Sequence, residues 1–217
     1  VMCLVAVYGV GVYHRTAQAC VPDLSKDTLW TLRSFVWLPV SEIFRDLGLP
    51  NNQPLNTLLI KVSMALFGNQ NVAVRLPAYL PGVAIPVVAS ALAQSIFARR
   101  RVTLLTLALC SFNGALVFYS GVARGYSLQT LLLVLFSLAV VRYEQVEERG
   151  TTRWASPLWR ILLVSCPLAA ALTLSPSILF IVPIVSCHLA WIGVRERRRW
   201  PGESLRGVFR HGAKQHR

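Results

Sequence analysis

One segment of the chain, residues 14–75, holds most of the acids and bases that lie outside the basic clusters. Its ionisable residues are His14, Arg15, Asp23, Lys26, Asp27, Arg33, Glu42, Arg45, Asp46, Lys61 and Arg75. A carboxylate of this kind can take a proton from a hydroxyl nucleophile, and a guanidinium can hold a phosphate through two hydrogen bonds. Arg124 is a further isolated cation in a later polar turn. The segment either builds a site for a polar or phosphorylated ligand, or carries charges that only solvate a loop.

The rest of the chain is apolar, and this composition excludes an ordinary soluble domain. The 217 residues are 54% hydrophobic and only 14% charged, with a mean hydropathy of +0.52, whereas soluble domains carry about 25% charged residues. Lys and Arg number 22 against 9 for Asp and Glu, which gives a net charge of +13. The basic residues cluster between apolar runs, which is typical of a membrane protein and not of nucleic-acid binding. We therefore expect an all-α membrane protein in the cell (inner) membrane, with the bilayer as a partner.

The apolar runs predict about six transmembrane helices. The first, residues 1–13, covers about 20 Å and is interpreted as a transmembrane helix whose start is cut off, with a signal-peptide core as the alternative. Residues 76–194 supply five more spans, of which the last two form a hairpin. Their expected positions are residues 76–98, 102–120, 126–141 and 161–194, with the hairpin broken at 174–177.

The basic clusters orient these spans. Residues 99–101, the charged loop 142–160 and the tail 195–217 are separated by even numbers of spans, so they share one side. That side is expected to be the cytoplasm. Both chain ends are then cytoplasmic, and the 14–75 segment and the turn at Arg124 lie on the outer face.

A short helix is expected inside the outer segment, at residues 55–67. Leucine and valine recur there with helical spacing, and polar residues fall on the opposite side. The segment is too short to cross a bilayer. We expect an amphipathic helix that lies flat at the outer membrane interface. Its apolar stripe consists of Leu55, Leu58, Leu59, Val62 and Leu66.

At residues 27–32, 51–78 and 119–126, the chain resembles, in the order and spacing of its motifs, the GT-C class of membrane glycosyltransferases. Residues 27–32 (Asp-Thr-Leu-Trp-Thr-Leu) are similar to the family's Asp-Glu-x-Trp-Thr segment. Residues 51–59 (Asn-Asn-Gln-Pro-Leu-Asn-Thr-Leu-Leu) are similar to its Asn-His-Pro-Leu segment, and residues 66–78 carry counterparts of Leu-Phe-Gly and Arg-Leu-Pro-Ser. Residues 119–126 (Tyr-Ser-Gly-Val-Ala-Arg-Gly-Tyr) match its Tyr-Ser-x-x-Ala-Arg-x-Tyr turn. The resemblance is closest to bacterial relatives of protein O-mannosyltransferase and of the lipid A aminoarabinose transferase.

The resemblance implies a glycosyltransferase that uses a polyprenyl-phosphate-linked sugar on the outer face. Asp27 is then the general base, with Asp23 as its substitute, although an acid at a helix start is favoured by the helix dipole without any catalytic role. Arg124 would bind the phosphate, its alternative being an interfacial anchor that snorkels. The implied substrate-binding residues are Arg124, Tyr126, Gln53, Asn52 and Arg75.

Trp30 and Trp37 are interpreted either as a sugar platform or as part of an aromatic belt. The chain departs from the family at Thr28, where a second acid is common, and at Gln53, where a histidine is common. A glutamine cannot carry a proton at neutral pH. These changes indicate a divergent acceptor or a loss of activity. They also remove the obvious metal ligands, so neither a bound metal nor a cofactor is expected.

The expected spans are fewer than such enzymes usually have, which suggests an N-terminal portion, either a fragment or a split subunit completed by a second membrane subunit. A catalytically inactive partner of a larger transferase is one alternative reading. A transporter or flippase for a lipid-linked substrate is another, but it would require ionisable residues inside the spans, where His188 stands almost alone. The sequence identifies neither the sugar nor the acceptor.

Overall fold

The computed structural model describes residues 2–45, 52–149, 155–173, 181–187 and 189–190. It divides into two compact units, Val1–Ile178 and Leu179–Arg217, and all the candidate site residues belong to the first. In the described part of the second unit, residues 181–187 are helical. Every regular element in the described ranges is a helix, which confirms the all-α class. The expected break at 174–177 and the basic tail 195–217 lie outside the described residues.

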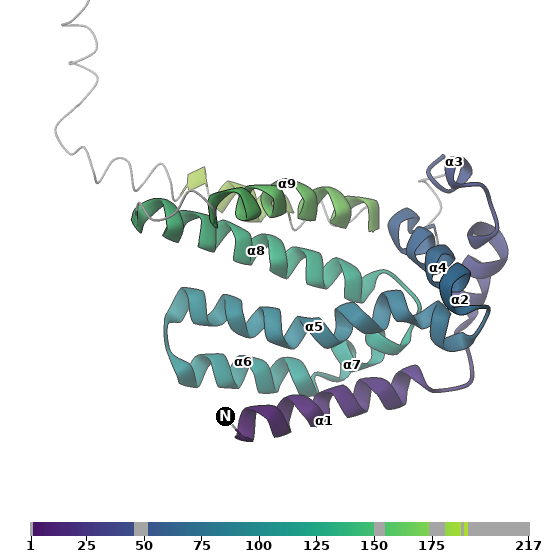
Figure 1. Ribbon diagram of the computed structural model, residues 1–217, viewed down its shortest axis with the longest axis horizontal. Helices are drawn as coiled ribbons and strands as arrows, with labels where there is room; N and C mark the ends of the chain where they lie inside the picture. The colour runs from purple at the N-terminus through teal and green to yellow at the C-terminus, as the bar shows by residue number, and fades with distance from the viewer. Residues whose placement is uncertain (1, 46–51, 150–154, 174–180, 188, 191–217) are drawn as a thin grey trace, which may run out of the picture. The chain divides into compact units, whose positions relative to one another are not determined.

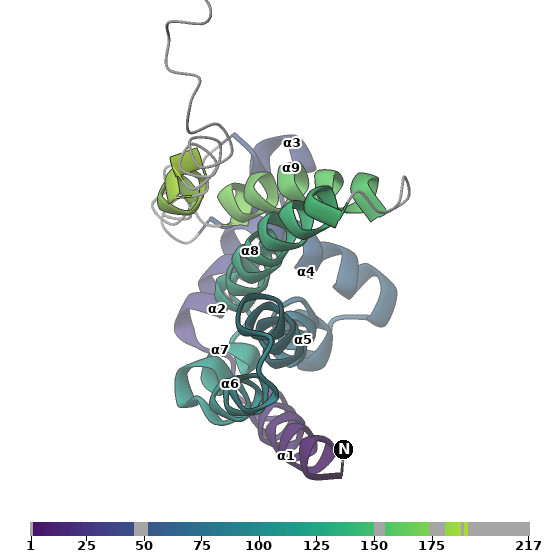
Figure 2. The ribbon, with the colours of Figure 1, turned by 90° about the vertical axis from the view of Figure 1, so that its left-hand side faces the viewer.

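The long helices of the first unit pack side by side. Helix α5 lies between α6 and α8, α9 lies against α8, and α1 runs along α6 and α7 (Figure 1, Figure 2). A second group of short helices, α2, η1, α3 and α4, covers one end of this row, and the candidate site lies there (Figure 1). The long elements are α1 (Met2–Ala19), α5 (Asn71–Phe97), α6 (Arg100–Phe112), α7 (Gly114–Gly121), α8 (Tyr126–Arg149) and α9 (Ala155–Thr173).

Helices α5 and α8 are long and apolar enough to cross a membrane, α8 over its Tyr126–Gln145 part. At 1.5 Å per residue the 27 residues of α5 extend about 40 Å, although three prolines lie inside the helix. Prolines are tolerated in this way in membrane helices, where neighbouring groups satisfy the freed carbonyls. Within the described residues, the structure therefore contains two candidate spans, or three if a bent pair is counted as one. The sequence-based count of six is not reached there.

The bent pair is α6 and α7, which the sequence analysis treated as one span over residues 102–120. The two helices meet at 51°, with the break at Asn113. The Asn113 side chain accepts a hydrogen bond from the Leu116 backbone N–H at 3.0 Å, and so it starts a new helix inside the apolar run. Asparagine is a favoured residue at such a helix start, and this explains the break.

Two expected loops are largely helical. Helix α1 continues through His14 and Arg15 to Ala19, beyond the expected end at residue 13. Helix α8 likewise runs on to Arg149, through charged residues that were expected to form the start of the loop 142–160. Polar and charged side chains are compatible with a helix, so the loss of apolar character did not mark either end.

The short helix α4 (Pro54–Phe67) confirms the helix expected at residues 55–67. Its orientation adds a fact that the pattern did not predict. The polar side, with Asn56, Thr57 and Ser63, is buried in the protein, and Ser63 donates a 2.6 Å hydrogen bond to the Ala73 carbonyl. The apolar stripe faces outward, and its Val62 and Leu66 are exposed. An outward apolar face of this kind suits contact with lipid.

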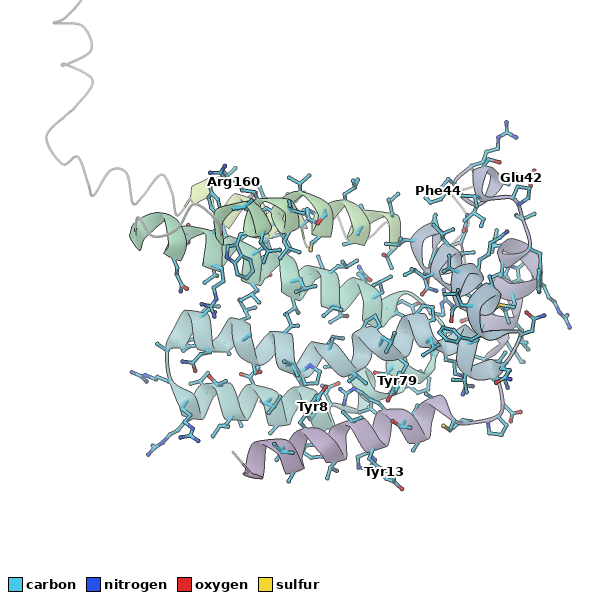
Figure 3. The ribbon with its side chains drawn as sticks, viewed as in Figure 1. Tyr8, Tyr13, Glu42, Phe44, Tyr79 and Arg160 are labelled. Carbon is cyan, nitrogen blue, oxygen red and sulfur yellow. The ribbon has the colours of Figure 1, made fainter. Side chains whose placement is uncertain are left out.

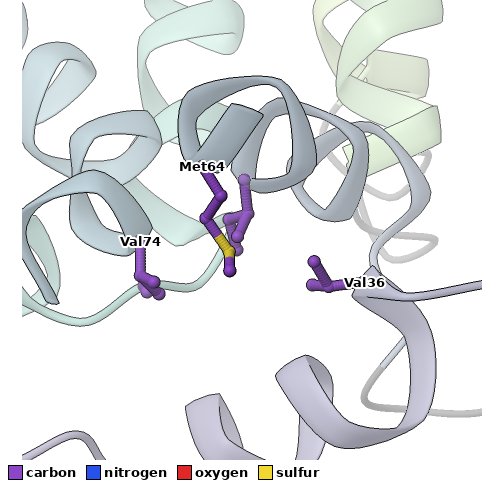
Figure 4. Close-up of a cluster of buried hydrophobic side chains, with 5 residues drawn as sticks. Val36, Met64 and Val74 are labelled. Atoms are coloured by element: carbon purple, nitrogen blue, oxygen red, sulfur yellow. The ribbon is translucent and has the colours of Figure 1, made fainter. Parts of the chain in front are cut away.

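A small hydrophobic core holds the short helices against α5. The 14–75 segment forms α2 (Lys26–Thr31), the π-helical η1 (Leu32–Val36) and α3 (Val40–Ile43). Met64 of α4 lies between Val36 of η1 and Val74 of α5 (Figure 4), and Ile60 and Ala123 complete the cluster. Ala123 belongs to the turn between α7 and α8, so this core joins that turn to the 14–75 segment.

Candidate functional site

The candidate site is centred on an ion pair between two residues far apart in the chain. Arg124 Nη1 lies 2.6 Å from Asp27 Oδ2. The Arg124 side chain is 10% exposed and the Asp27 side chain 59% exposed, so the carboxylate forms the open side of the pair. The resemblance implies a base at Asp27 and a phosphate-binding cation at Arg124, and the structure brings these two residues into direct contact.

The local sequence explains the position of Asp27. Ser25 precedes α2 and caps it, because its Oγ accepts a hydrogen bond from the Thr28 N–H at 3.2 Å. Asp27 then falls in the first turn, where the helix dipole favours a negative charge. Thr28 is buried, and its hydroxyl is hydrogen-bonded to Ser25 Oγ at 2.8 Å. The residue that replaces the family's second acid is therefore part of the helix cap.

Arg124 is held in a tight turn between α7 and α8. Its backbone N–H bonds to the Val122 carbonyl at 2.7 Å. The guanidinium carbon lies 5.3 Å from the centre of the Tyr126 ring, and that ring packs on Tyr119 with 4.8 Å between centroids. A cation over an aromatic face is stabilised by the ring quadrupole. Tyr126 therefore touches Arg124 through its ring.

Gln53 and Asn56 hold this turn from the start of α4. Gln53 Oε1 accepts a hydrogen bond from the Gly125 N–H, and Asn56 Nδ2 donates to the Ala123 carbonyl at 3.5 Å. An added Cβ on Gly125 would lie 2.5 Å from Thr173 Cγ2, so any larger residue there requires Thr173 or the turn to shift. Asn56 is fully buried and was not singled out from the sequence, although it lies one helical turn after Gln53 on the polar side of α4.

Arg75 lies near the site but has a different set of partners. Its Nη1 donates to the carbonyls of Ala19, at 2.7 Å, and of Val21, and its Nη2 donates to the carbonyl of Asp23 at 2.6 Å. The residue is almost completely buried. It thus clamps the segment between the end of α1 and the start of α2. Its expected contact with substrate stays a prediction.

Asn52 contacts the end of α3, and the side chains of the two tryptophans are exposed. Asn52 is buried, and its Nδ2 donates to the Ile43 carbonyl at the end of α3 at 2.8 Å. Trp30 and Trp37 are strongly exposed, as either a sugar platform or an aromatic belt would require.

A pocket of about 190 Å³ lies beside α2 and the turn that carries Arg124, and neither Asp27 nor Arg124 is among its lining residues. Thr28, which follows Asp27, lines it together with Val122 of the Arg124 turn. Its other lining residues are Gln18, Val21, Asp23, Leu24, Ser25, Arg75, Phe118 and Gly121. Within the described ranges no three His, Cys, Asp or Glu side chains come close enough to form a metal site. The ion pair and the pocket lining together offer the carboxylates of Asp23 and Asp27, the guanidinium groups of Arg75 and Arg124, and several hydrogen-bonding groups.

The fold and the site together define an apolar helical protein with an acid–base pair at one end of its helices. Residues 51–205 match the family model described as dolichyl-phosphate-mannose-protein mannosyltransferase. The match covers well over half of the chain, so the chain belongs to this family of GT-C type membrane glycosyltransferases, and the resemblance is confirmed. Arg124 and its turn lie inside the matched range, whereas Asp27 precedes it. Neither the comparison with curated proteins nor that with solved structures finds a match.

Proposed function

We propose that the chain transfers a sugar from a polyprenyl-phosphate donor to an acceptor on the outer face of the membrane, alone or as the N-terminal portion of an enzyme. The observation that supports this most is the Asp27–Arg124 pair. A lipid-borne donor presents its phosphate at the headgroup level, where a guanidinium can bind two of its oxygens. The partner carboxylate then stands next to the reacting sugar.

In the proposed reaction, an acceptor hydroxyl oxygen attacks the anomeric carbon of the sugar. The bond between that carbon and the phosphate oxygen breaks, and polyprenyl phosphate leaves with the electron pair. Asp27 takes the proton from the acceptor hydroxyl, and Arg124 stabilises the charge that develops on the phosphate. Gln53 and Asn56 hold the turn that carries Arg124 through their hydrogen bonds, and the contact of Gln53 with substrate stays a prediction.

The proposed membrane arrangement keeps both chain ends in the cytoplasm and the short helices outside. The basic residues 99–101 at the start of α6 support this orientation through the positive-inside rule. The outward apolar face of α4 supports a position at the lipid interface beside the site. The six-span count remains part of this proposal.

An inactive partner subunit is the second candidate function, because Thr28 and Gln53 replace titratable residues of the family and are engaged in the helix cap and the turn. One assay separates the two. The full chain in proteoliposomes receives a polyprenyl-phosphate hexose and a cell-envelope extract as the acceptor mixture, and release of polyprenyl phosphate is measured. We expect Asp27→Asn to lower the rate at least a hundredfold, since a general base contributes about 10²–10⁴-fold. The control Asp23→Asn should retain the rate. A wild-type chain that binds the donor but releases no polyprenyl phosphate would favour the inactive partner.

A further inference from the structure

A second arginine, Arg15, is buried away from the ion pair. It lies on α1 and has no exposed surface. Its Nη1 donates to the carbonyls of Gly11 at 3.0 Å and Ser111 at 2.9 Å, and its Nη2 donates to the carbonyl of Cys110 at 2.7 Å. A buried charge among membrane helices is costly, and it persists where backbone carbonyls or other groups satisfy it. The mechanism proposed above gives this residue no role.

Two of these partners are carbonyls that the helix break sets free. The last backbone bond of α6 joins the Asn113 N–H to the Leu109 carbonyl at 2.9 Å, and the first of α7 joins the Val117 N–H to the Asn113 carbonyl at 2.9 Å. In an unbroken helix, the Cys110 and Ser111 carbonyls would accept from residues 114 and 115. Arg15 supplies hydrogen-bond donors in place of these two N–H groups, and its positive charge is favourable at the C-terminal, negative end of the α6 dipole.

The packing of α1 on this break is unusually close. An added Cβ on Gly11 would lie 2.8 Å from Ser111 Cβ, so the glycine allows Arg15 to reach the end of α6. Helix α7 then leaves at 51°. At its far end, an added Cβ on Gly121 would lie 2.8 Å from the Gln18 carbonyl oxygen of α1. Thus α1 contacts the last turn of α6 and the far end of α7, and the Arg124 turn follows directly.

We infer that Arg15 is a positioning residue that stabilises the α6–α7 break and thereby sets the place of Arg124 beside Asp27. This inference rests on the proposed function at one point, namely that Arg124 binds the phosphate of the lipid-linked sugar donor. A straight helix would satisfy the Cys110 and Ser111 carbonyls by itself. The bent form needs another donor, which the Arg15 guanidinium provides at both carbonyls together.

Helix α1 has other attachments that do not involve Arg15. The Tyr8 hydroxyl donates to the Val83 carbonyl of α5 at 3.1 Å, and Thr16 Oγ1 and the Tyr79 hydroxyl are hydrogen-bonded at 2.8 Å. Tyr8 and Tyr79 both lie between α1 and α5, whereas Tyr13 points away (Figure 3). Removal of the guanidinium should therefore release the end of α6 while α1 stays on α5. This makes Arg15→Met, a neutral change of similar length, a suitable variant.

The break can be measured directly with spin labels at Arg100 on α6 and Phe118 on α7, both at exposed positions. In nanodiscs, the wild type should give one narrow distance distribution. We expect Arg15→Met to broaden it toward the about 27 Å axial separation of an unbroken helix. Arg15→Lys keeps the charge but not the guanidinium's fork of donors, so its distance distribution should lie between those of the wild type and Arg15→Met. It replaces Arg15→Met as the test variant if Arg15→Met does not fold. His14→Met, an exposed neighbour on α1, is the matched control and should leave the distribution unchanged. An unchanged distribution in both Arg15 variants would overturn the inference.

The link to Arg124 is tested by a double-mutant cycle on the affinity for a polyprenyl-phosphate hexose. We expect Arg15→Met to weaken donor binding about tenfold. The double variant Arg15→Met, Arg124→Ala should bind the donor no worse than Arg124→Ala alone, because both substitutions act on the contact between Arg124 and the donor phosphate. Fully multiplicative losses would overturn the positioning role. If the wild type binds no donor, the proposed function fails, while the spin-label distances still decide whether Arg15 holds the break.

Discussion

At the scale of single residues, Asp27 and Arg124 neutralise each other, so a ligand that binds one of them competes with the other. A donor phosphate can bind two donors of the Arg124 guanidinium, which a lysine ammonium cannot reproduce geometrically. We expect Arg124→Lys to weaken binding of a polyprenyl-phosphate hexose and Arg124→Ala to weaken it further, by about ten- to a hundredfold, since a charge-assisted hydrogen bond contributes about 1.5–3 kcal/mol. Donor affinity in nanodiscs is the measurement. Equal affinities in all three forms would leave Arg124 as an interfacial anchor.

The same competition predicts an effect of opposite sign at Asp27. Asp27→Asn removes the negative charge that occupies Arg124, so donor affinity should rise even though transfer is lost. The carboxylate is well exposed, and exposed ion pairs contribute about 0.2–1 kcal/mol, which corresponds to a gain of up to about fivefold at low salt. The gain should shrink as salt is added. Asp23→Asn should show no gain. A fall in affinity would mean that Asp27 orients Arg124 for the phosphate.

The residue types at the site were predictable from the sequence, but their partners were not. Asp27, Arg124 and Tyr126 stand in recognisable order, and the structure brings these three together. The positions of Arg75 and Gln53 depend on which carbonyl or N–H lies opposite each side chain once the helices pack. That information is tertiary, and no spacing in one sequence carries it.

At the scale of elements, the turn between α7 and α8 depends on a close fit against α9. Gly125→Ala would place a methyl group 2.5 Å from Thr173 Cγ2, and overpacking of this kind costs about 1–3 kcal/mol. We expect a lower unfolding temperature in detergent and weaker donor binding. Thr173→Ser removes the opposing methyl and keeps the hydroxyl that donates to the Ala169 carbonyl at 2.7 Å.

The double variant Gly125→Ala, Thr173→Ser should therefore recover part of both losses. Gly114→Ala is the matched control, because an added Cβ there meets nothing within 4 Å. If Thr173→Ser gives no recovery, the loss comes from another neighbour of the turn, of which Gln53 Oε1, 3.0 Å from the added Cβ, is the first candidate.

Elements were predicted well where hydrophobic periodicity decides them and poorly where a capping group decides them. Helix α4 was expected from its leucine spacing and was found. The break at Asn113 rests on one side-chain hydrogen bond and two carbonyls satisfied by Arg15. An apolar run looks the same with or without such a break, so the pattern predicted one continuous helix. The burial of the polar side of α4 was missed for a related reason, since a stripe does not tell which side faces the protein.

At the scale of the whole molecule, the membrane orientation remains a prediction with a direct test. In a background without the five native cysteines, a single cysteine at Lys26 should react with an impermeant maleimide from the outside of intact cells. A cysteine at Arg100, in the basic cluster at the start of α6, should react only after permeabilisation. Both positions are exposed in the structure, so protein packing does not block the reagent.

The physical reason for this expectation is the length of α5 together with the charge rule. Lys26 lies in the short-helix group near the start of α5, Arg100 follows the end of α5, and the helix is long enough to separate the two faces of a bilayer. Three arginines at 99–101 are held on the cytoplasmic side by the positive-inside rule. Labelling of Arg100 from the outside and of Lys26 only after permeabilisation would invert the orientation. The Asp27–Arg124 pair would then face the cytoplasm, and the proposal of transfer on the outer face would be wrong. Labelling of both positions from the outside would show instead that α5 does not cross the membrane.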